Sequence, residues 1–178
     1  MIRTPVAVVP YLVAAAMIVA GILWHEADQL GGLGRTAESG TATIGGPFSL
    51  IDQDGKARTQ ADFRGRFLLI YFGYSFCPDV CPTTLAEMGA ALDKLGSKAD
   101  RVVPLFISID PERDTPKVLK AYMKSFGTNF IGLTGSIKNV EQAARAYHVY
   151  IKKRSLPGGS YSMDHSGVIY LMGPDGKF

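Results

Sequence analysis

The chain has 178 residues, of which 47% are hydrophobic and 20% are charged, so it can bury a core and is not globally disordered. The net charge of +3 is small and is not gathered into one basic run, which excludes an electrostatic case for nucleic-acid binding. Two cysteines are too few for a disulfide scaffold. The composition therefore favours one globular domain with an appendage, and the cysteine pair favours redox or metal chemistry.

The first predicted element is a membrane anchor. Residues 6–24 carry no charge, and as a helix at ~1.5 Å per residue they span roughly 28 Å, close to the hydrocarbon core of a bilayer. Arg3 precedes the segment, so the positive-inside rule places the start of the chain in the cytoplasm. Bulky Ile22-Leu23-Trp24 closes the segment, where a cleaved signal peptide ends in small residues. We expect an uncleaved anchor within residues 1–26.

The next segment, residues 27–46, is rich in glycine and is predicted to be a flexible linker. Residues 47–178 then form the exported domain. An Arg- and Ser-rich transit segment is lacking, which favours a bacterial inner membrane with the domain in the periplasm over a mitochondrion. The two cysteines would therefore face an oxidising compartment.

Alternating strands and helices are predicted in this domain, which indicates an α/β sheet with helices on both faces. The segment after Asp54-Gly55 completes a hairpin, and Pro104 favours a bulge or an irregular start in its strand. A turn at residues 173–176 has no returning strand, so we expect a C-terminal strand and helix to be missing. The predicted strands are Phe67–Phe72, Arg101–Ile109, Phe130–Leu133, Val149–Ile151 and Val168–Met172. The predicted helices run from Pro82 to near Gly96, from the Thr115 cap to Gly127, and from Gly135 or Ser136 through Tyr147.

Both cysteines lie in one strand-to-helix turn, Phe76-Cys77-Pro78-Asp79-Val80-Cys81-Pro82. Proline suits the first helical position, so Pro82 places Cys81 at or next to the helix N-cap. Unpaired N–H groups and the helix dipole favour thiolate there, and we expect the pKa of Cys81 to be lowered. No prediction is made for Cys77.

Counting ligands narrows the metals that the pair can hold. Soft thiolates select Cu(I), Zn²⁺ or iron–sulfur clusters. A structural zinc site needs four ligands and a cluster normally needs four cysteines, whereas Cu(I) is satisfied by fewer. Two sulfurs therefore leave a third ligand to be found. His25 reads as a membrane-interface residue, His148 as a structural histidine, and His165, in a polar loop before a strand, is an open candidate.

Three motifs together resemble the Sco/SenC family: Cys77–Pro82, Ser108–Pro116 and Asp164-His165-Ser166. The resemblance covers residues 47–178. Members of the family are membrane-anchored, thioredoxin-like copper proteins that help to assemble cytochrome c oxidase, so it implies a thioredoxin-like fold with a central mixed sheet. It also implies that Cys77, Cys81 and His165 bind one copper ion as Cu(I), and it leaves binding of Cu(II) open. Asp79 and Asp164 become candidates to orient these ligands, and Asp110 and Asp114 to shape the rim of the site.

The leading hypothesis is a copper chaperone, not an enzyme, that delivers its ion to the binuclear copper site of an oxidase subunit. Its partners would be that copper-receiving subunit, the membrane, and another periplasmic copper chaperone or a thiol reductant; nucleic acid is not expected. The alternative is a thiol–disulfide oxidoreductase that reduces the cysteines of the target. A purely structural disulfide ranks last, because so short a closed loop stabilises little and leaves His165 without a role.

Overall fold

The computed structural model describes residues 17, 19–20, 43–127 and 129–178. Residues 43–178 form one compact unit. The predicted anchor, apart from Met17, Val19 and Ala20, and the predicted linker up to residue 42 lie outside the described residues. Within the described part of the chain, no helix has the length and apolar character needed to span a membrane.

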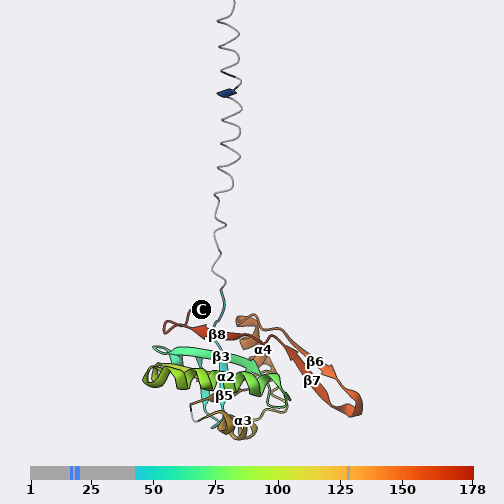
Figure 1. The fold of residues 1–178 in the computed structure, drawn as a ribbon. Helices are drawn as coiled ribbons and strands as arrows, with labels where there is room; N and C mark the ends of the chain where they lie inside the picture. Colours follow the sequence, from blue (N-terminus) through green and yellow to red (C-terminus); the bar gives the residue numbers. More distant parts are fainter. Residues whose placement is uncertain (1–16, 18, 21–42, 128) are drawn as a thin grey trace, which may run out of the picture. The chain divides into compact units, whose positions relative to one another are not determined.

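A six-stranded mixed sheet forms the centre of the unit, in the order β2-β1-β5-β4-β3-β8 (Figure 1). β3 runs parallel to β4, and β4 runs parallel to β5, whereas β8 and β1 are antiparallel to their neighbours. β6 and β7 form a separate two-stranded hairpin. The strands are β1 (Ser49–Asp52), β2 (Ala57–Thr59), β3 (Phe67–Gly73), β4 (Val102–Ser108), β5 (Ile131–Thr134), β6 (Ile151–Ser155), β7 (Tyr161–His165) and β8 (Ile169–Met172).

Helices cover both faces of the sheet, as predicted. Tyr71 of β3 contacts Cys81 of α2 on one face, and the next residue, Phe72, packs against Tyr147 at the end of α4 on the other. Phe106 links Tyr71 to Tyr122 of α3, so α3 shares the face of α2. The α-helices are α2 (Val80–Leu95), α3 (Pro116–Met123) and α4 (Ile137–Ala146), and short 3-10 turns span Gln60–Phe63, Gly96–Arg101, Lys124–Phe126 and Pro157–Gly159.

Local signals explain where these elements begin. Gly55 adopts a φ of 81° in the turn between β1 and β2, a conformation that glycine takes without strain. The side chains of Thr115 and Ser136 accept hydrogen bonds from the backbone of the first turns of α3 and α4. Gly127 ends the turn after α3 with a φ of 110°. These predictions are confirmed.

Two sequence expectations are wrong. Pro104 causes no bulge, since β3 and β4 keep an unbroken register from Phe67 to Gly73; β5 pairs only from Leu105 onward, so the ladder on that side needs no donor from Pro104. The polar segment after residue 160 is strand β7 and not a loop. Its partner β6 begins only at Ile151, so Val149 and Tyr150 of the predicted strand precede it, and it continues to Ser155. Polar residues hid this hairpin, because a strand exposed to solvent needs no apolar alternation.

Burial predicts how two leucines of α2 differ in their effect on stability. Leu85 is 0% exposed and Leu95 is 45% exposed. We expect Leu85→Ala to lower the free energy of unfolding by about 2–5 kcal/mol, because a cavity replaces packed side-chain atoms. Leu95→Ala should cost less than about 0.5 kcal/mol. Urea unfolding of both variants measures this, and equal losses would contradict the packing described here.

Candidate metal centre

The cysteine turn lies at the carboxyl ends of the parallel strands β3 and β4, the edge where open sheets place functional groups. β3 ends at Gly73, and a Cβ atom at that position would lie 3.0 Å from Cys81 Sγ and 2.9 Å from the ring of Phe106. Only glycine therefore lets the sulfur approach the strand so closely. Both cysteines are free thiols; Cys81 is fully buried and Cys77 is partly exposed.

The helix begins earlier than the sequence predicted, and this changes the chemistry of Cys81. α2 starts at Val80, so Cys81 is its second residue and Pro82 its third, where a missing N–H still breaks no helical hydrogen bond. Burial raises the pKa of Cys81 to about 12, although the Tyr71 hydroxyl donates a hydrogen bond to the sulfur at 3.7 Å. The predicted lowering of this pKa by the helix end is wrong, because desolvation of the thiolate outweighs the dipole.

His165, the last residue of β7, lies against this buried sulfur. Its Nε2 is 3.7 Å from Cys81 Sγ, across 84 residues of sequence. Its Nδ1 is 3.0 Å from the carbonyl oxygen of Ser166. A carbonyl can only accept, so Nδ1 carries the proton and Nε2 presents a lone pair toward Cys81. The rings of Tyr71 and Tyr74 each lie 6.1 Å from the imidazole, edge to face, and fix its plane.

The third predicted ligand, Cys77, contacts the backbone of Cys81. Its Sγ accepts a hydrogen bond from the backbone N–H of Cys81 at 3.4 Å. In the described residues, no three His, Cys, Asp or Glu side chains already stand in the arrangement of a metal site. The pair Cys81–His165 has suitable spacing, because a sulfur at about 2.3 Å and a nitrogen at about 2.0 Å from one metal lie roughly 3.6–3.8 Å apart. The structure thus brings Cys81 and His165 into contact, with Cys77 Sγ against the backbone of Cys81.

Other residues singled out from the sequence lie elsewhere. Asp79 is exposed and makes no capping hydrogen bond. The carboxylate of Asp164 pairs with Arg154, and the hydrogen-bond partner of the His165 ring is instead the Ser166 carbonyl. The ring of His148 contacts the Thr43 carbonyl at 3.2 Å, in keeping with a structural role. His25 lies outside the described residues.

Asp114 is buried beside the cysteine turn. Its carboxylate accepts hydrogen bonds from the Ser75 backbone N–H at 3.0 Å, from the Ser75 hydroxyl and from Ser108 Oγ at 2.6 Å. Burial raises its pKa, and these hydrogen bonds oppose that rise. Asp114 therefore connects the turn before Cys77 to the end of β4 through hydrogen bonds. This is how it would shape the rim of the site, as expected from the sequence.

Three residues near the site were not predicted: Tyr71, Tyr74 and Arg113. The two tyrosines stand in a run of apolar and aromatic residues that reads as ordinary core. Arg113 lies in a charged loop, and no local pattern tells that its guanidinium packs on aromatic rings. The one signal in the sequence is that these core positions hold tyrosine and not phenylalanine, because a buried tyrosine hydroxyl usually has a polar partner.

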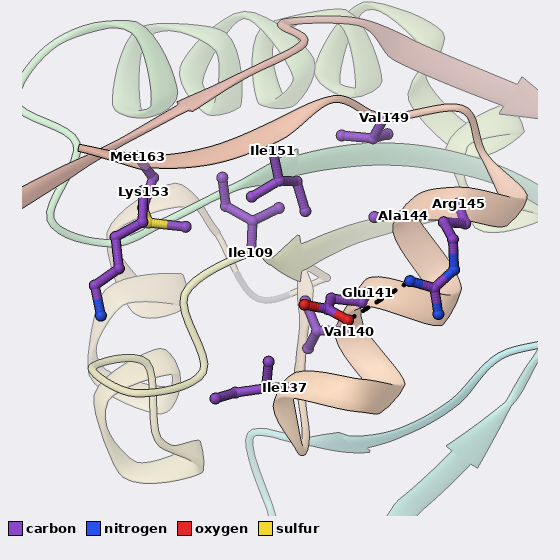
Figure 2. A pocket seen from close by; sticks show the side chains of 10 residues that line it. All are labelled: Ile109, Ile137, Val140, Glu141, Ala144, Arg145, Val149, Ile151, Lys153 and Met163. Carbon is purple, nitrogen blue, oxygen red and sulfur yellow. Dashed lines mark ion pairs between the residues drawn. The ribbon is translucent and has the colours of Figure 1, made fainter.

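A groove of about 400 Å³ lies next to this region but is separate from it (Figure 2). Its wall on one side is α4, and on the other it is the start of the β6–β7 hairpin. The lining is mainly aliphatic, and the two charged residues of its helical wall, Glu141 and Arg145, pair with each other. None of the three site residues lines it, so this groove is not the metal centre.

Comparison with known proteins defines the class of the molecule. Residues 36–178 match the family model described as SCO1/SenC. The chain is 39% identical to protein SenC of Rhodobacter capsulatus over 167 residues, covering 90% of this chain and 76% of that protein. It is 46% identical to protein SCO1 homolog 1, mitochondrial, of Arabidopsis thaliana over 141 residues, covering 79% of this chain and 42% of that protein.

Solved structures agree. Bradyrhizobium japonicum ScoI with copper bound has a TM-score of 0.73 and 49% identity, covering 76% of this chain and 86% of that one. BsSco, a member of the Sco family of cytochrome c oxidase assembly proteins in which a disulfide switch was identified, has a TM-score of 0.63 and 30% identity, covering 78% and 83%. The mixed α/β, thioredoxin-like fold predicted from the sequence is confirmed by these neighbours.

The protein is thus a thioredoxin-like domain with a cysteine pair and a histidine at one edge of its sheet. It belongs to the SCO1/SenC family. The chain spans 42% to 49% of the length of several mitochondrial relatives that it matches.

Burial predicts an order of reactivity for the two thiols. Iodoacetamide attacks thiolate, and it modifies a cysteine only where it can reach the sulfur. Because burial raises the pKa of Cys81 to about 12, Cys81 should stay protonated and unmodified at pH 7–9, while the partly exposed Cys77 is alkylated. Mass spectrometry of peptides from the reduced protein measures this. Cys81 should react only after denaturation, and faster labelling of Cys81 than of Cys77 would contradict the site as described.

Proposed function

We propose that this domain is a copper chaperone that holds one copper ion through Cys77, Cys81 and His165. The observation that carries the proposal is the 3.7 Å contact between Cys81 Sγ and His165 Nε2, beside the partly exposed Cys77. Two soft sulfurs and one imidazole suit Cu(I), which accepts a low coordination number. The copper-bound ScoI neighbour supports this choice of metal, with Cu(II) as the second state to test.

The protonation of the site bears on loading. A thiol must lose its proton to bind a metal, so copper uptake at Cys81 releases a proton that the buried sulfur otherwise retains. Partly exposed Cys77 offers the point at which copper enters and leaves. A thiolate of another protein can coordinate the ion there before Cys81 and His165 dissociate from it. This order of steps makes transfer to that protein feasible.

The receiving protein in this proposal is the copper-binding subunit of cytochrome c oxidase. BsSco supports it, because that neighbour belongs to the cytochrome c oxidase assembly proteins. The uncharged segment at residues 6–24 would tether the domain to the bacterial inner membrane on its periplasmic side, next to the membrane-bound oxidase. Another periplasmic copper chaperone would supply the ion.

A second candidate function is thiol–disulfide exchange with the cysteines of the receiving subunit. The disulfide switch of BsSco and the approach of Cys77 Sγ to the Cys81 backbone support it. Cys77 is the thiol that a mixed disulfide can reach, and Cys81 would resolve it. The two functions separate in an insulin-reduction assay and a copper titration of the same protein: turnover without copper retention would favour exchange.

Matched histidine variants test the chaperone proposal. We expect His165→Ala to weaken Cu(I) affinity by about 10-fold or more, since one ligand is lost, while His148→Ala leaves it unchanged. Affinity is measured by competition with a chromogenic Cu(I) chelator, and the metal content by elemental analysis, with Cys77→Ala as a second ligand variant. Copper binding that is equal in wild type, His165→Ala and His148→Ala would refute the proposed ligand set.

A further inference from the structure

The β6–β7 hairpin carries His165, yet in the described residues neither of its strands pairs with a strand of the main sheet. Figure 1 shows the hairpin extending away from the main sheet. Backbone ladders therefore do not set the distance between His165 and the cysteine turn. That distance depends on the short connection from His165 to β8 and on the side chains that hold the hairpin to the domain.

Arg113 provides the most extensive of these contacts. Its guanidinium carbon lies 3.7 Å from the centre of the Tyr161 ring, at the start of β7, and 4.8 Å from that of Phe76, next to Cys77. Its Nη1 donates to the Tyr161 carbonyl oxygen at 3.0 Å, and its Nε pairs with Asp110. The Tyr161 hydroxyl closes the group by donating to Asp110 Oδ1 at 2.8 Å. One guanidinium thus contacts both the cysteine turn and the strand of the histidine.

This group, Asp110, Arg113 and Tyr161, is here called the Arg113 latch. Asp110 is 1% exposed, and its carboxylate forms an ion pair with the guanidinium of Arg113. Lys153 of β6 lies over the same Tyr161 ring at 3.9 Å and adds a second cation. A guanidinium can stack flat on a ring while its N–H groups donate to two different partners, and the ammonium group of lysine cannot do this.

The same face of the hairpin also borders a groove, since Met163 lies between Tyr161 and His165 at two-residue spacing along β7. There the groove of about 400 Å³ separates Ile151 and Met163 of the hairpin from Ile137 and Val140 of α4 (Figure 2). The side chains that would pack these two elements together leave a hollow. Ile151 and Met163 still pack partly against the hydrophobic core. The Arg113 latch therefore holds the hairpin together with these apolar contacts and with His165.

We propose that Arg113 and Tyr161 are positioning residues for the metal centre: the latch fixes β7 so that His165 Nε2 meets Cys81 Sγ. This inference rests on the proposed copper site. Neither residue touches the metal. Releasing the latch would let the hairpin move, lengthen the reach from His165 to copper, and weaken the ion's third bond while both sulfurs stay in place.

The test compares Tyr161→Leu with Tyr150→Leu in the whole chain. Tyr161→Leu removes the ring and hydroxyl of the latch but keeps the Arg113–Asp110 ion pair, so no buried charge is left alone. Tyr150, next to β6 and 56% exposed, offers the same substitution outside the latch. We expect Cu(I) affinity to fall about 10- to 100-fold in Tyr161→Leu, the usual effect of losing a group that orients a ligand, and to be unchanged in Tyr150→Leu.

Two further measurements distinguish positioning from a general loss of stability. The thiolate-to-Cu(II) charge-transfer band should shift in Tyr161→Leu, and amide hydrogen exchange of residues 161–165 in the copper-free protein should quicken, while exchange in β3 and β4 stays slow. Arg113→Lys should retain part of the affinity through its charge, and Arg113→Gln should not. Equal affinity, spectrum and exchange in Tyr161→Leu and wild type would overturn the latch. If the wild-type protein binds no copper, the proposed function is wrong, and so is the role of the latch in positioning a copper ligand. Faster amide hydrogen exchange of the hairpin in Tyr161→Leu would then show only that the latch stabilises the hairpin.

Discussion

The contact between Cys81 and His165 is the interaction on which the arrangement of this domain depends. It joins the first turn of α2 to the last residue of β7, across 84 residues. The contact requires two segments distant in sequence to meet at a fully buried sulfur, beside the partly exposed Cys77. The fold meets this demand from two directions: Gly73 lets the helix approach the strand, and the hairpin brings the imidazole over the helix end.

Burial and the helix end act on the same thiol in opposite directions, and their magnitudes decide the result. Charges at a helix terminus gain about 0.3–2 kcal/mol. A pKa raised to about 12 is a shift of several kcal/mol, since each pKa unit is worth about 1.4 kcal/mol. Desolvation therefore wins, and Cys81 keeps its proton at neutral pH. A metal that binds thiolate strongly can still displace that proton, which favours soft ions over weakly bound ones.

Buried carboxylates connect the loops around the site. Asp114 holds the turn before Cys77 through Ser75, and Asp110 holds Arg113, which in turn packs on Phe76. Both acids come from one short loop after β4, so one segment organises the cysteine turn and the base of the hairpin together. Burial of such groups is costly unless each is paired, and here each has its partners. The charged loop after β4 thus holds the cysteine turn and the hairpin in place through Asp114, Asp110 and Arg113.

Local sequence patterns were enough to predict the strands of the main sheet, the caps of α3 and α4 and the two thiols on one turn, because these depend on local periodicity, turn residues and spacing. The sequence also pointed to His165, but only through the resemblance of Asp164-His165-Ser166 to a known motif. The tertiary structure decided the rest: the pKa of Cys81, which depends on what covers the sulfur, the polar hairpin that carries His165, and the packing of Arg113 between rings distant in sequence. These features arise from contacts between segments far apart in the chain, and local patterns carry no record of such contacts.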